Sequence, residues 1–161
     1  PDFFKKHHLI NRGISGQTTP QMVLRFRQDV IDLKPEKVVI LGGINDIAGN
    51  TGPSTLKMIQ DNIQNMAVLA RDAGIEVILC SVLPANKIPW RNNMDPSSKV
   101  KELNAWIKQF ADRNGFGYVD YYTALVDSRD GLQEEYTSDG VHPNLDGYRV
   151  MEKCLIHLLA R

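Results

Sequence analysis

The stretch Lys37-Val38-Val39-Ile40-Leu41-Gly42-Gly43-Ile44-Asn45-Asp46 joins a short apolar run to two glycines and two polar side chains. Such a run predicts a buried strand, and the residues after it predict a loop. Comparable apolar runs occupy residues 75–82 and 118–121, and residues 9–11 resemble the tail of a fourth strand. Nearly continuous apolar strands are typical of a parallel sheet that is covered on both faces.

Helical patterns alternate with these strands. In the first, we expect Thr19 as the N-cap and Pro20 as the first helical residue, and Pro35 ends the pattern. Further helices are predicted over residues 54–74, over 97–115 and from 144 onward. This alternation indicates an α/β fold with a parallel sheet. We expect a single domain over residues 1–161.

The composition argues against several functional classes. The chain carries 19 Lys plus Arg and 19 Asp plus Glu, so its zero formal charge gives no support for binding to nucleic acid or to an anionic membrane. No apolar run approaches the ~20 residues that span a bilayer. Cys80 lies in an apolar run and Cys154 in a helical pattern, which favours buried free thiols over a disulfide between them.

The loops that follow the strands contain the unusual sequence of this chain. In open α/β sheets, ligands bind at the carboxyl ends of the strands. The loops expected there span residues 11–19, 42–52, 83–95 and 121–144, and three of the four are glycine-rich or unusually polar. This coincidence predicts one shared site.

Two of these loops offer hydrogen-bond donors. In Asn11-Arg12-Gly13-Ile14-Ser15-Gly16-Gln17-Thr18, glycine lets a backbone N–H approach a ligand, although a plain strand-to-helix turn is the better interpretation of this motif by itself. In Gly42-Gly43-Ile44-Asn45-Asp46, the Asn45 amide can donate into a site and Asp46 can bind backbone N–H groups. An Asx-turn is the alternative for this second motif.

A third loop holds a candidate acid–base pair, in Ser138-Asp139-Gly140-Val141-His142-Pro143-Asn144. An acidic residue three positions before a histidine can hold the imidazole in the tautomer that acts as a general base. A histidine near a helix start is more often structural when it stands alone. The pairing with Asp139 gives the catalytic interpretation equal weight.

Together these three motifs resemble the second, third and fifth blocks of the SGNH hydrolases, also called the GDSL esterase/lipase family. The order and the separations match over residues 8–160. The resemblance implies a three-layer α/β/α fold with a flavodoxin-like parallel sheet. It also implies that His142 is the general base and that Asp139 orients it. The backbone N–H of Gly16 and the amide of Asn45 would form the oxyanion hole.

The sequence departs from the family pattern at the nucleophile. The family's first block, Gly-Asp-Ser after the first strand, is absent from these 161 residues. Ser15 is a poor replacement, because its surroundings do not form the Gly-x-Ser-x-Gly motif. Since the first strand lies inside a flavodoxin-like sheet, we expect an incomplete N-terminus. The missing segment would be a cleaved and retained piece, an unrecorded part of the chain, or part of another copy.

The resemblance implies that the complete protein cleaves small carboxylic esters through an acyl-enzyme and needs no metal or other cofactor. The 161-residue chain alone would be inactive. We expect a short acyl group, for example acetyl on a carbohydrate, because the sequence has no long apolar lid. Trp90 could stack on a sugar ring or cover an acyl chain, but packing its own loop is equally compatible.

Other functions fit the same sequence. The family resemblance also covers lipid acylhydrolases, such as lysophospholipases and thioesterases. A non-catalytic binding module could keep the fold without the serine. His7 and His8 could suggest a metal site, but solvent-facing histidines are the better interpretation of an adjacent pair near a terminus.

Overall fold

Three short parallel strands form the sheet in the computed structural model, which describes residues 2–91 and 93–159. The strands are β1 (Lys37–Ile40), β2 (Glu76–Cys80) and β3 (Gly117–Val119), in the order β1-β2-β3. Val39 is the register partner of Ile78, and Leu79 is the partner of Tyr118. The predicted α/β fold with a parallel sheet is therefore confirmed.

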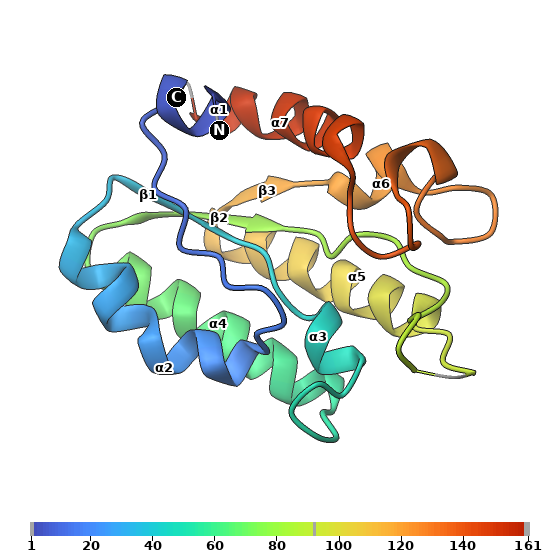
Figure 1. Cartoon of the computed structure of the whole chain (residues 1–161). Helices are drawn as coiled ribbons and strands as arrows, with labels where there is room; N and C mark the ends of the chain where they lie inside the picture. Colours follow the sequence, from blue (N-terminus) through green and yellow to red (C-terminus); the bar gives the residue numbers. More distant parts are fainter. Residues whose placement is uncertain (1, 92, 160–161) are drawn as a thin grey trace.

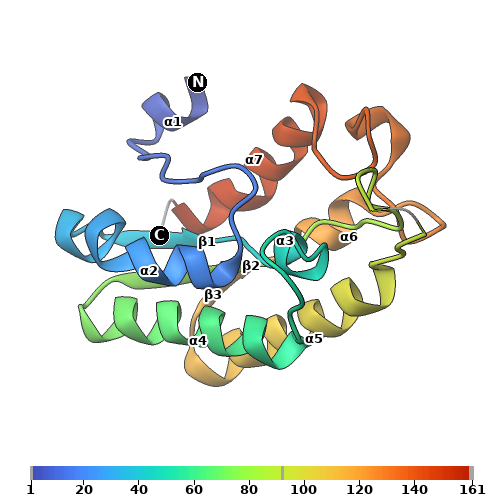
Figure 2. The same ribbon diagram turned by 60° about the horizontal axis from the view of Figure 1, so that its bottom comes forward.

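Helices cover both faces of this sheet (Figures 1 and 2). One face carries three helices, α2 (Thr19–Asp29), α4 (Leu56–Asp72) and α5 (Ser97–Asn114). The other carries α7 (Leu145–Leu159), with the short α1 (Asp2–Lys6) and α6 (Tyr121–Leu125) on the same side. The remaining helical turns are α3 (Ile44–Ile47) and two 3-10 turns, Ile31–Leu33 and Glu134–Tyr136. These three layers agree with the expected architecture.

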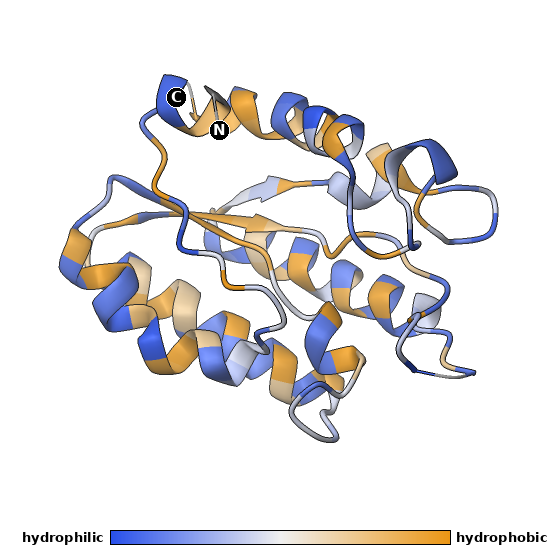
Figure 3. Cartoon of the chain, viewed as in Figure 1, coloured by the Kyte–Doolittle hydropathy of each residue, from blue (hydrophilic) through white to orange (hydrophobic). Residues whose placement is uncertain are grey.

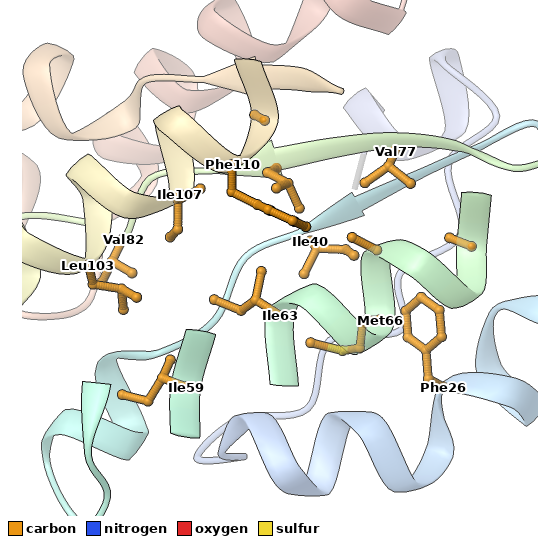
Figure 4. Close-up of a cluster of buried hydrophobic side chains, with 14 of the residues drawn as sticks. Phe26, Ile40, Ile59, Ile63, Met66, Val77, Val82, Leu103, Ile107 and Phe110 are labelled. Atoms are coloured by element: carbon orange, nitrogen blue, oxygen red, sulfur yellow. The ribbon is translucent and has the colours of Figure 1, made fainter. Parts of the chain in front are cut away.

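The core is divided between the two faces because successive strand side chains point to opposite sides. In β2, Val77 and Leu79 join the cluster under α2, α4 and α5, whereas Ile78 and Cys80 join the cluster under α7. Figure 4 shows part of the first cluster. β1 and β2 are hydrophobic after their first residues, Lys37 and Glu76, whereas the helices mix hydrophobic and hydrophilic residues (Figure 3). This pattern is typical of amphipathic helices on a buried sheet.

Helix boundaries follow local signals with small shifts from the prediction. The N-cap of α2 is Thr18, whose backbone N–H donates to Gln21 Oε1 (3.0 Å), so Thr19 is already helical. The α4 cap is Thr55, one residue after the expected Ser54. The predicted span of α5 is confirmed, and it ends at Gly115 with φ of 67°. Gly115 thus provides the left-handed residue that commonly ends a helix.

The fourth strand expected at residues 9–11 is wrong for the described chain. These residues form no strand there, and Ile10 is 70 % exposed. A strand needs a partner, and within residues 2–91 and 93–159 only β2 pairs with β1. On the α7 side, Val39 and Leu41 are each 36 % exposed, which is high for this type of strand.

Both cysteines are free thiols, so the disulfide alternative is excluded. Cys80 is buried, and this burial raises its pKa to about 12, whereas Cys154 is only half-buried. Among the helices of the described residues, none is both long and apolar enough to cross a bilayer.

Candidate active site

A buried carboxylate ties the loop after β1 to the start of α2. Both oxygens of Asp46 accept from the backbone N–H of Thr19 (3.0 and 2.9 Å), and the Thr19 hydroxyl donates to Oδ1 (2.6 Å). Burial raises the pKa of Asp46, although the hydrogen bonds from Thr19 oppose this rise. The expected role of Asp46 in binding backbone N–H groups is confirmed. It holds the segment before α2 against the carboxyl end of β1.

The place where the loop after β1 meets the segment before α2 is called the junction. Asn45, the neighbour of Asp46, points its side-chain amide across this junction. Its Nδ2 donates to the carbonyl oxygen of Gln17 (2.9 Å), and its Oδ1 accepts from Asn50 Nδ2 (3.1 Å). An amide nitrogen carries two hydrogens, so the contact with Gln17 uses one of them. The orientation of Asn45 is thus defined by an acceptor on one side and a donor on the other.

Gly16 lies on the other side of this junction in an open turn. The backbone N–H of Gln17 donates to the Ile14 carbonyl (3.4 Å), and Gly16 has φ of +76°, a value that favours glycine at this turn position. A Cβ at Gly16 would meet no heavy atom within 4 Å, so the space beside it is open. The Gly16 carbonyl accepts from Asn50 Nδ2 (3.4 Å), which brings Gly16 and Asn45 to the same side chain.

Asp139 and His142 form the expected pair. His142 Nδ1 lies 2.7 Å from Asp139 Oδ2, and Asp139 Oδ1 accepts from the backbone N–H groups of Val141 and His142, both at 2.8 Å. Burial acts to raise the pKa of Asp139, but the hydrogen bonds from His142 and Val141 outweigh it and hold this pKa well below its usual range. The carboxylate therefore stays charged and faces Nδ1, which leaves Nε2 for proton exchange.

Trp90, in the loop after β2, connects the acid–base pair to the rest of the site. Its indole stacks on the His142 imidazole, with ring centroids 5.7 Å apart and an interplanar angle of 28°. Its Nε1 donates to Asn50 Oδ1 (3.2 Å). The neighbouring Arg91 donates to the carbonyls of Ala48 and Gly49 (2.9 and 2.8 Å), so two consecutive residues hold this loop to the loop after β1.

The structure thus places all five predicted site residues at the carboxyl ends of the strands. Asn45 and Gly16 meet at Asn50, Asn50 meets Trp90, and Trp90 meets His142. A cavity of about 160 Å³ opens beside them, and its lining includes Gly13, Gln17, Gly42, Asn45 and Val141. Sequence reasoning missed Asn50 and Arg91, because neither belongs to a recognised motif and both act through non-local contacts.

Two other candidates from the sequence lie apart from this arrangement. The hydrogen bonds of the described residues include none between Ser15 and His142, so Ser15 does not form a nucleophile–base pair there. The His7 ring packs against Phe3, with centroids 4.7 Å apart, so His7 is half-buried, whereas His8 is exposed as expected. Within the described ranges, no group of three or more His, Cys, Asp or Glu side chains could hold a metal ion.

Comparison with known proteins identifies the family to which this site belongs. The model of the GDSL-like lipase/acylhydrolase family matches residues 2–150. The chain belongs to this family. The match spans nearly the whole chain and includes the loops that contain Gly16, Asn45 and the Asp139–His142 pair, which confirms the resemblance found in the sequence.

Several bacteria have similar proteins. A GDSL-like lipase from Bacteroides thetaiotaomicron is 46% identical, with a TM-score of 0.96 over 99% of this chain and 79% of that one. An acetylxylan esterase from Geobacillus stearothermophilus is 25% identical over 92% of this chain and 70% of its own length. Esterase TesA from Pseudomonas aeruginosa is 30% identical over 86% of this chain, which spans 63% of that protein.

Proposed function

We propose that the complete protein hydrolyses carboxylic esters by acyl transfer, with His142 as the general base. The observation that carries this proposal is the 2.7 Å contact between His142 Nδ1 and the charged carboxylate of Asp139. This contact leaves Nε2 to accept the proton of a serine hydroxyl and later to return it to the leaving alcohol. Membership of the GDSL-like family and two esterase relatives support the same reaction.

The oxyanion of the tetrahedral intermediate would accept hydrogen bonds from the Asn45 amide and the Gly16 N–H. The residues that carry these two donors lie beside each other, because Asn50 Nδ2 donates to both the Asn45 Oδ1 and the Gly16 carbonyl. Loss of one such donor typically lowers the rate by ~100- to 1,000-fold. Asp139 would remain charged throughout and stabilise the imidazolium that forms when His142 takes the proton.

The attacking serine would come from a Gly-Asp-Ser segment outside these 161 residues. Two observations support this part of the proposal. The β1 edge away from β2 has no partner strand within the described ranges, and Val39 and Leu41 beside it are each 36 % exposed. A strand paired there would satisfy the free backbone groups of β1 and end near the cavity beside Asn45. On this proposal, the 161-residue chain alone does not turn over esters.

The substrate we propose carries a short acyl group, for example acetyl on a carbohydrate. The cavity of about 160 Å³ is smaller than the roughly 300–1,000 Å³ typical of sites for larger ligands. Trp90 is 44 % exposed and its ring lies against His142, so it offers an aromatic surface for a sugar next to the proposed base. One relative is named an acetylxylan esterase, which supports the same choice.

The test uses the complete protein with p-nitrophenyl acetate and p-nitrophenyl octanoate. We expect the acetate to be hydrolysed faster, and His142→Ala to lower kcat by at least about 1,000-fold. Faster hydrolysis of the octanoate would favour a lipid acylhydrolase. Full activity in His142→Ala would overturn the proposed mechanism.

The absence of Gly-Asp-Ser from these 161 residues favours a second candidate, a non-catalytic binding module. Sequencing the gene upstream of Pro1 separates the two candidates. Codons for Gly-Asp-Ser in that upstream sequence would support the esterase proposal. If the complete protein lacks it but binds acetylated oligosaccharides in calorimetry without releasing acetate, the binding module is correct.

A further inference from the structure

We infer that Asn50 is a positioning residue that sets the direction of the Asn45 amide and connects it to Trp90 and thereby to His142. This inference rests on the proposed function of Asn45 and His142. The contacts run from Trp90 Nε1 to Asn50 Oδ1 (3.2 Å), from Asn50 Nδ2 to Asn45 Oδ1 (3.1 Å), and from Asn45 Nδ2 to the Gln17 carbonyl (2.9 Å). These three hydrogen bonds form the Asn50 bridge.

The direction of the Asn50 bridge follows from the chemistry of its two ends. The indole N–H of Trp90 can only donate, so the Asn50 oxygen must face it. The Asn50 nitrogen then faces Asn45, which requires the Asn45 oxygen at that contact. The Asn45 nitrogen must therefore face Gln17, whose carbonyl can only accept. Trp90 and Gln17 therefore require the same orientation of the two amides. Exchanging the oxygen and nitrogen of either Asn45 or Asn50 would place donor against donor at one contact and acceptor against acceptor at another.

This order matters because an oxyanion hole needs a donor and not an acceptor. With the Asn45 oxygen held by Asn50, the Asn45 nitrogen stays on the side of Gln17, where the cavity lining also includes Gly13 and Ile14. Asn50 Nδ2 also approaches the Gly16 carbonyl (3.4 Å). One side chain thus contacts the residues that carry both proposed oxyanion donors.

The far end of the Asn50 bridge lies against the proposed base. Trp90 stacks on His142, and the Arg91 bonds to the carbonyls of Ala48 and Gly49 hold the same two loops together. The backbone N–H of Asn50 donates to the Asn45 carbonyl (3.0 Å), so the loop itself closes on Asn45. The distance between the oxyanion donor and the base is therefore constrained by contacts that pass through Asn50.

Kinetics of the complete protein on p-nitrophenyl acetate test this role, with Asn50→Ala, Asn50→Asp and Trp90→Phe. Asn50→Ala should lower kcat by about tenfold with KM nearly unchanged, since its three partly solvated side-chain hydrogen bonds are lost. Asn50→Asp is almost the same size and still accepts from Trp90, but it places a carboxylate oxygen against the Asn45 oxygen. It should therefore lower kcat more than alanine does. Trp90→Phe keeps an aromatic ring at His142 and should have the smallest effect.

A purely steric role for Asn50 predicts the reverse order, with the isosteric Asn50→Asp milder than Asn50→Ala. Rates are compared on the high-pH plateau so that an added charge near His142 does not alter the ranking. Asn114→Ala is the matched control, because Asn114 makes one side-chain bond to the Phe110 carbonyl (2.8 Å) at the far end of α5. Unchanged kcat in Asn50→Ala, or the reversed order, would overturn the inference.

Nitrogen–proton NMR of the complete protein provides a readout that does not depend on activity. Asn50→Ala should shift the indole resonance of Trp90 and the side-chain amide pair of Asn45, whereas Asn114→Ala should move neither. If these resonances stay in place, the Asn50 bridge is not formed in solution and the inference fails. If they shift but the wild-type protein releases no nitrophenol, it is the proposed function that fails.

Discussion

The carboxylate of Asp46 accepts three hydrogen bonds from Thr19, two from its backbone N–H and one from its hydroxyl at 2.6 Å. Both residues are almost fully buried. The contact joins residues that are 27 positions apart and fixes the Gly16 turn relative to the loop that contains Asn45. The two proposed oxyanion donors thus depend on one buried pair outside the cavity.

Replacing Asp46 by Ala should destabilise the protein and disorder the site. The buried N–H and hydroxyl of Thr19 would lose their acceptor, which typically costs about 1–3 kcal/mol for each buried unsatisfied group. Urea denaturation measures the change in the free energy of unfolding. Asp72→Ala, on the exposed end of α4, is the control and should change it by less than about 0.5 kcal/mol. Equal stability of the two variants would contradict this account of the junction.

Gly43→Ala should be more damaging than Gly52→Ala. Both glycines have positive φ, 126° and 106°, so both variants carry backbone strain. A Cβ at Gly43 would also lie 2.8 Å from Leu103 Cδ2 in the core, whereas one at Gly52 meets nothing within 4 Å. The difference in melting temperature between the variants therefore isolates the steric clash. Gly43→Ala should also lower kcat of the complete protein, because Gly43 is two residues before Asn45.

Asp139 should make the protein sensitive to acid. Because its pKa is lowered in the folded state, the unfolded chain takes up the proton first as pH falls. The free energy of unfolding should therefore decrease as pH falls below about 4, the ordinary range of an aspartate pKa. Asp139→Asn cannot titrate, so its stability should change less with pH between about 4 and 2. Chemical denaturation at stepped pH measures both slopes, and identical slopes would refute the prediction.

Val39→Asp should distinguish the 161-residue chain from the complete protein. In the described structure Val39 is 36 % exposed beside the free edge of β1, so the substitution should be tolerated there within about 1 kcal/mol. If a further strand pairs with β1 in the complete protein, Val39 becomes buried, and an unpaired carboxylate there should cost at least about 2 kcal/mol. Equal effects in both proteins would argue against the additional strand.

Local signals in the sequence were enough to predict much of the fold. The strands around Val39, Ile78 and Val119 follow from apolar runs, and α5 follows from its periodicity and from Gly115. The short α3 and α6 were not predicted, because helices of 4 and 5 residues are too short to show a period. The strand predicted at residues 9–11 was wrong, because a strand exists only when another segment pairs with it.

The candidate site also has a part that local sequence predicts and a part that depends on tertiary contacts. The sequence by itself determined the Asp139–His142 pair and the presence of Asn45 after β1, because these features depend on residues that are neighbours along the chain. Only the tertiary structure decided that Trp90 stacks on His142 and that Asn50 connects it to Asn45. The two Trp90 contacts join loops 40 or more positions apart, and packing of the helices against the sheet, not local sequence, brings such loops to one edge.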